Sequence, residues 1–187
     1  RERYLALGRA KLRETPDDPR AHAELGNQYA ELGRYAEAAR AYRQALALQP
    51  DNAGVLKDLG AMLHLLGTPE PARQALELAV RIEPDNADAW RNLAVVHAQR
   101  EAWAEANACL DEALARTPEV SALHRYRALM LLRLERNDEA WLAAARAVDL
   151  APGLAESWET AAHVARATGH ENDLKALRTQ WPGRPPA

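Results

Sequence analysis

The sequence of 187 residues contains no phenylalanine and only one cysteine, Cys109. A single cysteine cannot form an internal disulfide, and a thiolate metal site needs further ligands of the same kind. We therefore expect Cys109 to be a small apolar residue that packs on a helix. One cysteine is compatible with any cellular compartment.

Strand-forming and membrane-spanning segments are also missing. Runs of β-branched residues do not occur, whereas Ala, Leu, Arg and Glu, which favour helices, are abundant. No apolar stretch approaches the roughly 20 residues of a membrane-spanning helix, so we expect no membrane insertion. The chain begins at Arg1 without a methionine, which suits a mature form or a fragment of a longer protein.

Charge and chemical motifs exclude several function classes. The formal net charge of −3 gives no overall attraction to nucleic acid, and no nucleic-acid partner is expected. A Gly-rich phosphate loop, a His-Glu-x-x-His pair and a nucleophile elbow are all absent. The six histidines form no i,i+4 pair on one helix. The sequence therefore predicts no enzymatic activity, no metal site and no cofactor.

What the sequence does contain is a repeat. Five prolines recur at intervals of 34 residues, namely Pro16, Pro50, Pro84, Pro118 and Pro152. Each follows a helical pattern and precedes a new one, as expected of prolines that stop helices. Acidic residues or Asn follow three of them and suit the turn and the next helix cap. Gly33, Gly67 and Gly169 lie between paired helices, where a left-handed residue is needed.

The apolar residues keep the same register. With the prolines at position 32 of each unit, large residues recur at positions 4, 7, 11 and 24, and small ones at positions 8, 20 and 27. The first complete unit carries Leu25, Gly26, Tyr29, Ala38, Tyr42 and Ala45. This pattern resembles the tetratricopeptide repeat, in which small residues let two helices approach and neighbouring units stack. The resemblance implies an all-α, right-handed superhelical solenoid of antiparallel helix pairs.

The register divides the chain into seven parts. Residues 1–18 are predicted to be a helix of a truncated preceding repeat and its turn. Four repeats follow at 19–52, 53–86, 87–120 and 121–154, and the fourth is divergent. Residues 155–181 are predicted to form a degenerate capping helix pair, and residues 182–187 a tail or linker. We expect a helix at about 171–180.

In the tetratricopeptide family the first helix of each unit lines a concave groove, chiefly through positions 2, 5, 9, 12 and 13. Position 5 carries three successive cations, Lys57, Arg91 and Arg125. The remaining groove candidates of this chain are Asn27, Ala61, His64, Val95, Leu129, Leu132 and Arg133. We expect the apolar members to contact apolar side chains of a peptide and Asn27 to bind its backbone. Some relatives carry asparagine at position 6 of successive units. In this chain only one unit has asparagine at that position, Asn92.

The cations favour an acidic segment as the partner, although a solvated basic face is an equally weighted interpretation. The main hypothesis is a protein-interaction scaffold or adaptor that holds a peptide or partner protein. Bacterial relatives of this composition serve in envelope biogenesis, secretion, pilus assembly or cytochrome maturation. Two alternatives are the non-catalytic arm of a larger enzyme, such as a glycosyltransferase or sulfotransferase, and a scaffold that self-associates through exposed repeat ends.

Overall fold

A computed structural model describes residues 2–181 of the chain, with side chains from Leu5 onward. Within these residues it contains eleven helices and no strand, which confirms the predicted all-α helical-repeat fold. The helices are α1 (Glu2–Glu14), α2 (Pro19–Glu31), α3 (Tyr35–Leu48), α4 (Ala53–Leu65), α5 (Pro69–Ile82), α6 (Ala87–Gln99), α7 (Trp103–Arg116), α8 (Ser121–Arg133), α9 (Asn137–Leu150), α10 (Ala155–Thr168) and α11 (Glu171–Gln180). The predicted helix at about 171–180 is therefore present.

The helices occur in pairs that follow the 34-residue register. Predicted repeats 19–52, 53–86, 87–120 and 121–154 each contain two helices, although their boundaries stay predictions. The predicted tail, 182–187, lies outside the described residues. No helix in the part of the chain that the structure describes is long and apolar enough to span a membrane.

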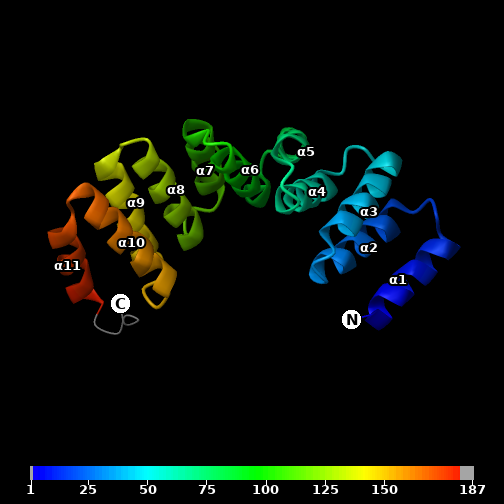
Figure 1. The fold of residues 1–187 in the computed structure, drawn as a ribbon, viewed down its shortest axis with the longest axis horizontal. Coiled ribbons are helices and arrows are strands. Elements are labelled where there is room, and N and C mark those ends of the chain that lie inside the picture. The colour runs from blue at the N-terminus through cyan, green and yellow to red at the C-terminus, as the bar shows by residue number, and fades with distance from the viewer. Residues whose placement is uncertain (1, 182–187) are drawn as a thin grey trace. The chain divides into compact units, whose positions relative to one another are not determined.

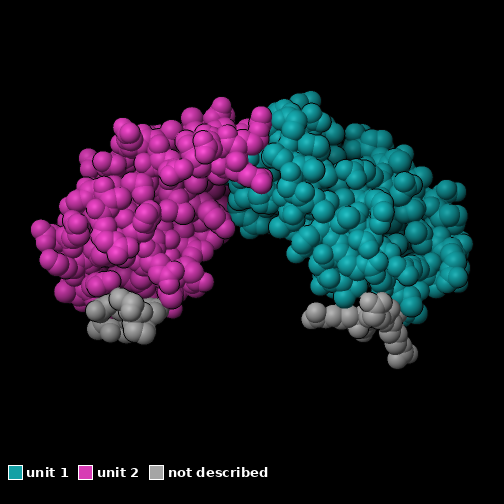
Figure 2. Space-filling model, in the orientation of Figure 1, with its two compact units in different colours: residues 1–96 teal, residues 97–187 magenta. Residues whose placement is uncertain are grey.

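The chain forms two compact units, Arg1–Val96 and His97–Ala187, shown in Figure 2. The division falls inside α6 and not at a predicted repeat boundary. In the first unit, α2 packs against α3 and α4 against α5 (Figure 1). Gly26 and Gly60 allow this close packing, because a Cβ atom at either position would lie 2.5 Å from Tyr42 or Leu76.

The second unit has its own apolar core. The buried members include Leu131, Trp141, Trp158 and Val164, which come from α8, α9 and α10. The ring of His170, the residue that precedes α11, stacks on Trp141 with ring centroids 5.6 Å apart. This aromatic contact helps to hold α11 against α9.

The turns within the helix pairs share one backbone conformation. The residues at intervals of 34 from Gly33 all have positive φ: Gly33, Gly67, Glu101, Glu135 and Gly169. The residue after each donates its backbone N–H to a carbonyl five residues earlier, as Arg34 does to Tyr29 at 2.9 Å. The left-handed residues expected at the three glycines are thus confirmed, and two glutamates adopt the same conformation.

Side-chain hydrogen bonds cap the first helix of each of the first three repeats. Asp18, Asn52 and Asn86 accept hydrogen bonds from backbone N–H groups of α2, α4 and α6, as the sequence predicts. Thr68 does not do so at α5. Its hydroxyl donates to the Leu63 carbonyl at 2.8 Å, so Thr68 occupies the N-cap position of α5 without a capping hydrogen bond from its side chain.

A ring nitrogen at position 4 repeatedly hydrogen-bonds the proline carbonyl that precedes its helix. The four pairs, each at 2.8 Å, are His22 with Pro16, Trp90 with Pro84, His124 with Pro118 and Trp158 with Pro152. Each bond satisfies a carbonyl at the turn between repeats. The position-4 side chains therefore hold these turns as well as packing against them.

Candidate functional site

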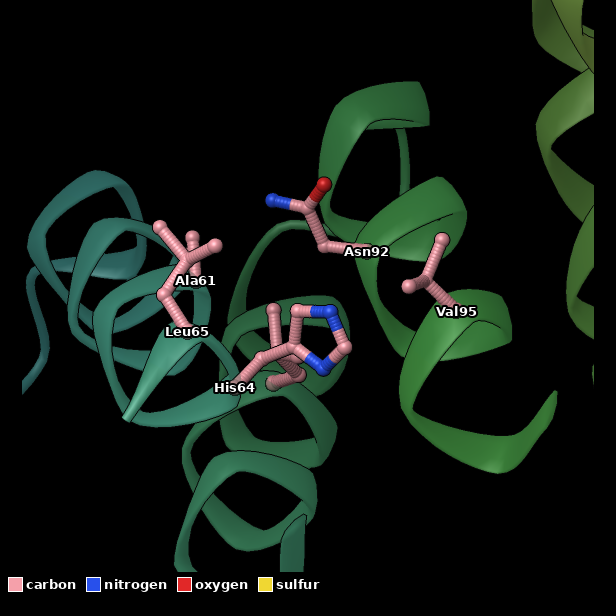
Figure 3. Close-up of a pocket in the computed structure, with 6 residues that line it drawn as sticks. Ala61, His64, Leu65, Asn92 and Val95 are labelled. Atoms are coloured by element: carbon pink, nitrogen blue, oxygen red, sulfur yellow. The ribbon is translucent and has the colours of Figure 1, made fainter. Parts of the chain in front are cut away.

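A pocket opens in the first unit between α4, α5 and α6 (Figure 3). It comprises about 420 Å³ of space between the side chains, part of which is open solvent. Its lining residues are Ala61, His64, Leu65, Leu76, Asn92 and Val95. Four of these side chains are apolar, and the two polar ones carry no formal charge when the histidine is neutral.

Helical spacing explains why these residues meet. Ala61, His64 and Leu65 are three and four residues apart on α4, so they share one face of that helix. Asn92 and Val95 are three residues apart on α6 and face them across the opening in Figure 3. Leu76 from α5 forms the buried floor, because Gly60 has no side chain to displace it.

The two position-5 cations of the first unit, Lys57 and Arg91, each form an ion pair within the protein. Lys57 Nζ lies 3.2 Å from Asp58 Oδ1, and Arg91 Nη1 lies 3.0 Å from Asp88 Oδ1. Arg91 Nη2 also lies 3.5 Å from Asn92 Oδ1, at the edge of the pocket. These pairs are partly exposed, so each contributes only about 0–1 kcal/mol and leaves the cation able to exchange partners.

The first repeat differs from the second at the place that corresponds to the pocket. The Tyr42 hydroxyl donates a hydrogen bond of 2.7 Å to Asn27 Oδ1. Burial raises the pKa of Tyr42 above its usual value, and the nearby carboxylates of Asp58 and Glu31 raise it further. Asn27, which we expected to bind a peptide backbone, therefore uses this oxygen for a contact within the protein.

The other predicted groove residues lie in the second unit. Arg125 and Leu129 are half-buried on α8, and Arg125 forms no ion pair with any described residue. Leu132 is half-buried against the core of this unit. The guanidinium of Arg133 lies over the ring of Trp103, 4.6 Å from its centroid, which gives this cation a packing role.

The structure thus brings three predicted groove residues, Ala61, His64 and Val95, into one pocket. Lys57 and Arg91 are not among its lining residues. Leu76 was assigned to the core from its position in the repeat, so sequence reasoning missed its second role as the pocket floor. The available signal was the pairing of leucine at position 24 with alanine at position 9, where the first repeat has Tyr42 and Asn27.

The described residues contain no group of three or more His, Cys, Asp or Glu side chains placed to hold a metal ion. Cys109 is buried on α7, in agreement with the expected apolar packing role. The pocket lining is mostly apolar, and His64 and Asn92 are its two hydrogen-bonding side chains.

Two family models match the sequence. The model described as cytochrome c-type biogenesis protein H TPR domain matches residues 2–123, about two thirds of the chain, and a tetratricopeptide repeat model matches residues 103–155. The search of curated protein sequences gave no match.

Several solved structures have a similar fold. PilW, described as a type IV pilus biogenesis factor, has a TM-score of 0.83 at 20% identity, covering 96% of this chain and 83% of its own. PilF of Pseudomonas aeruginosa has a TM-score of 0.80 at 22% identity, covering 97% and 85%. YrrB, described as a TPR protein with an unusual peptide-binding site, has a TM-score of 0.75 at 18% identity, covering 91% and 88%. At these identities the likeness concerns the fold.

Proposed function

The chain belongs to the family of cytochrome c-type biogenesis protein H TPR domains, and we propose that it is a protein-interaction scaffold in c-type cytochrome biogenesis. Tetratricopeptide units present the surfaces of their first helices side by side, and such surfaces suit a segment of another protein. The observation that carries the proposal is the pocket between α4, α5 and α6, because four of its lining residues are first-helix side chains at groove positions: Ala61, His64, Leu65 and Val95.

The proposed ligand is an extended or helical protein segment with an apolar side chain and acidic residues. The apolar side chain occupies the pocket, where Val95 and Ala61 offer apolar surface. The acidic residues face the position-5 cations. Arg125 is the strongest candidate for a carboxylate, since it has no ion pair with a described residue, whereas Lys57 and Arg91 must exchange Asp58 and Asp88 for the ligand.

Charge reversal tests both the scaffold role and the acidic ligand. We expect the triple variant Lys57→Glu, Arg91→Glu, Arg125→Glu to lower the amount of c-type cytochrome in cells at least about tenfold, as two or three lost charge contacts imply. The measurement is covalently bound haem in membranes of a deletion strain that expresses either the variant or the unaltered protein. Far-UV circular dichroism of the purified variant checks that the helices remain.

A matched control reverses three exposed arginines on second helices, Arg43, Arg81 and Arg146, which belong to α3, α5 and α9. This control changes the net charge by about the same amount but leaves the first helices unaltered. We expect it to support normal cytochrome levels. Equal haem signals for both triple variants would contradict the role of the position-5 cations, and normal haem in the deletion strain itself would contradict the role in cytochrome biogenesis.

A further inference from the structure

The two repeats of the first unit offer the same backbone frame with different side chains at position 24. In each, the position-24 side chain lies against a glycine of the preceding helix: Tyr42 against Gly26, and Leu76 against Gly60. A Cβ atom on either glycine would come within 2.5 Å of that side chain. The two side chains therefore start from equivalent places and differ in how far they reach.

The two side chains reach different distances from these glycines. Tyr42 extends to position 9 of its own repeat, where Asn27 accepts its hydroxyl at 2.7 Å. Leu76 is shorter and has Ala61 at position 9, so the space above it stays open as the pocket. The corresponding space in the first repeat is bridged by the Tyr42–Asn27 hydrogen bond and has the carboxylates of Glu31 and Asp58 nearby.

The pocket lining indicates what can enter. Its walls carry no carboxylate, lysine or arginine, so a charged side chain would lose its water without gaining an ionic partner. An apolar side chain gains from leaving water, by about 25 cal/mol for each Å² of apolar surface buried. His64 and Asn92 are the two hydrogen-bonding side chains of the lining, and they can contact the polar backbone that carries such a side chain (Figure 3).

We infer that Leu76 and Tyr42 together set the register of the bound segment. One uncharged apolar side chain of the partner binds above Leu76 between α4, α5 and α6, and Tyr42 excludes a second apolar anchor between α2, α3 and α4. This inference rests on the proposed function, because it specifies the partner segment that the scaffold holds. It makes position 24 a determinant of specificity, although sequence alone assigns that position to packing.

The test uses capped amino acids as probes and methyl NMR as the readout. Acetyl-leucine amide, acetyl-lysine amide and acetyl-glutamate amide are titrated into the full chain with labelled Ala, Leu and Val methyl groups. We expect the leucine probe alone to shift the Ala61, Leu65 and Val95 methyl signals in a saturable manner. The Ala30 methyl, at the corresponding place in the first repeat, should stay unchanged.

One substitution at position 24 should fill the pocket, and the reverse substitution should open a second one in the first repeat. Leu76→Tyr should weaken binding of the leucine probe about tenfold or more, because the longer side chain fills the space. Tyr42→Leu should retain the response of Val95 and add a new response at Ala30. Ala61→Leu fills the pocket from the partly exposed α4 side and serves as a second blocking variant if Leu76→Tyr does not fold, as judged by circular dichroism.

The outcomes separate this inference from the proposed function. Equal shifts with the leucine, lysine and glutamate probes, or undiminished leucine binding in both blocking variants, would overturn the inference. If the leucine probe does not shift the methyl signals of the pocket while the charge-reversed triple variant still lowers cytochrome levels, the inference fails and the scaffold function stands. A leucine probe that binds above Leu76, in a protein whose deletion leaves cytochrome levels normal, supports the pocket and overturns the proposed function.

Discussion

The two units keep the same 34-residue backbone plan with different side chains. The first unit has glycine at both of its left-handed turns, Gly33 and Gly67, and glycine where its helix pairs pack most closely. The second has glutamate at two of its three such turns and a core that contains two tryptophans. Glycine removes steric strain but buries no surface, whereas a larger side chain buries more surface and needs more room.

This difference shows that backbone strain and side-chain packing contribute differently to the stability of the two units. The second unit tolerates glutamate in a conformation that costs a non-glycine residue about 1–2 kcal/mol, because packing elsewhere holds the turns in place. The first unit has unstrained turns and leaves an open pocket among its helices. The second unit is thus packed more fully, whereas the first keeps space for a ligand. Substitutions at equivalent positions should therefore change the free energy of unfolding by different amounts in the two units.

The largest expected effect comes from the tryptophans at position 4. Trp158 is 5% exposed in the core of the second unit, whereas Trp90 in the first is only half-buried. We expect Trp158→Ala to lower the free energy of unfolding by about 3–5 kcal/mol, and Trp90→Ala to lower it clearly less. Urea denaturation measures both. Both variants lose the same kind of hydrogen bond to a proline carbonyl, so the difference reports burial.

Hydrogen exchange sharpens this comparison. If the two units are separate cooperative bodies, Trp158→Ala should reduce the protection of backbone amides mainly within residues 97–187. Trp90→Ala should reduce it mainly within residues 1–96. Equal losses of stability, or losses of protection spread evenly over the chain for both variants, would show that the units do not differ as described.

The helix pairs could be predicted from the sequence because two independent signals, the prolines and the apolar residues, recur with the same period of 34 residues. Prolines end the pairs and apolar residues mark their contacts, so the class of fold follows without knowledge of distances. The αL turns at Gly33, Gly67 and Gly169 follow from the absence of a Cβ. Glu101 and Glu135 occupy the same place in the register, but a glutamate by itself gives no sign of positive φ.

The pocket could be predicted only in part. Ala61, His64 and Val95 were found from the helical face on which they lie. The part played by Leu76 depends on how far a side chain from another helix reaches, which a repeat pattern does not contain. The ion pairs that occupy Lys57 and Arg91 depend likewise on rotamers, although Asp58 and Asp88 stand close to them in sequence.

An effect of intermediate size is expected at the turns. Glu135 has a φ of 58°. Glu135→Gly should raise the free energy of unfolding by about 0.5–1 kcal/mol, since relief of backbone strain exceeds the added entropy of the unfolded chain. Gly67→Ala should lower it by about 1 kcal/mol for the opposite reason. Gly153→Ala is the control, because Gly153 lacks a positive φ and an added Cβ meets nothing within 4 Å. A stabilising Gly67→Ala would contradict this account.

The smallest expected effect is a pH dependence at His124, the position-4 residue of the second unit's first helix pair. Burial lowers the pKa of His124, and Arg146 and Arg127 lower it further, while the hydrogen bond with the Pro118 carbonyl acts in the opposite direction. Between this lowered pKa and the usual value of about 6.5, the unfolded chain binds the proton more readily than the folded one. Stability should therefore fall as the pH is lowered through about 6.5.

Leucine stands at position 4 of the second repeat, as Leu56, so His124→Leu is a substitution that the repeat accommodates. We expect this variant to lose less stability than the unaltered protein between pH 7.5 and pH 5, measured by urea denaturation at both values. The effect is small because Nε2 can donate to the Pro118 carbonyl in both protonation states, which leaves only the cost of the extra charge. NMR titration should place the midpoint of the His124 ring below about 6.5, and a midpoint above that value would reverse the sign of the prediction.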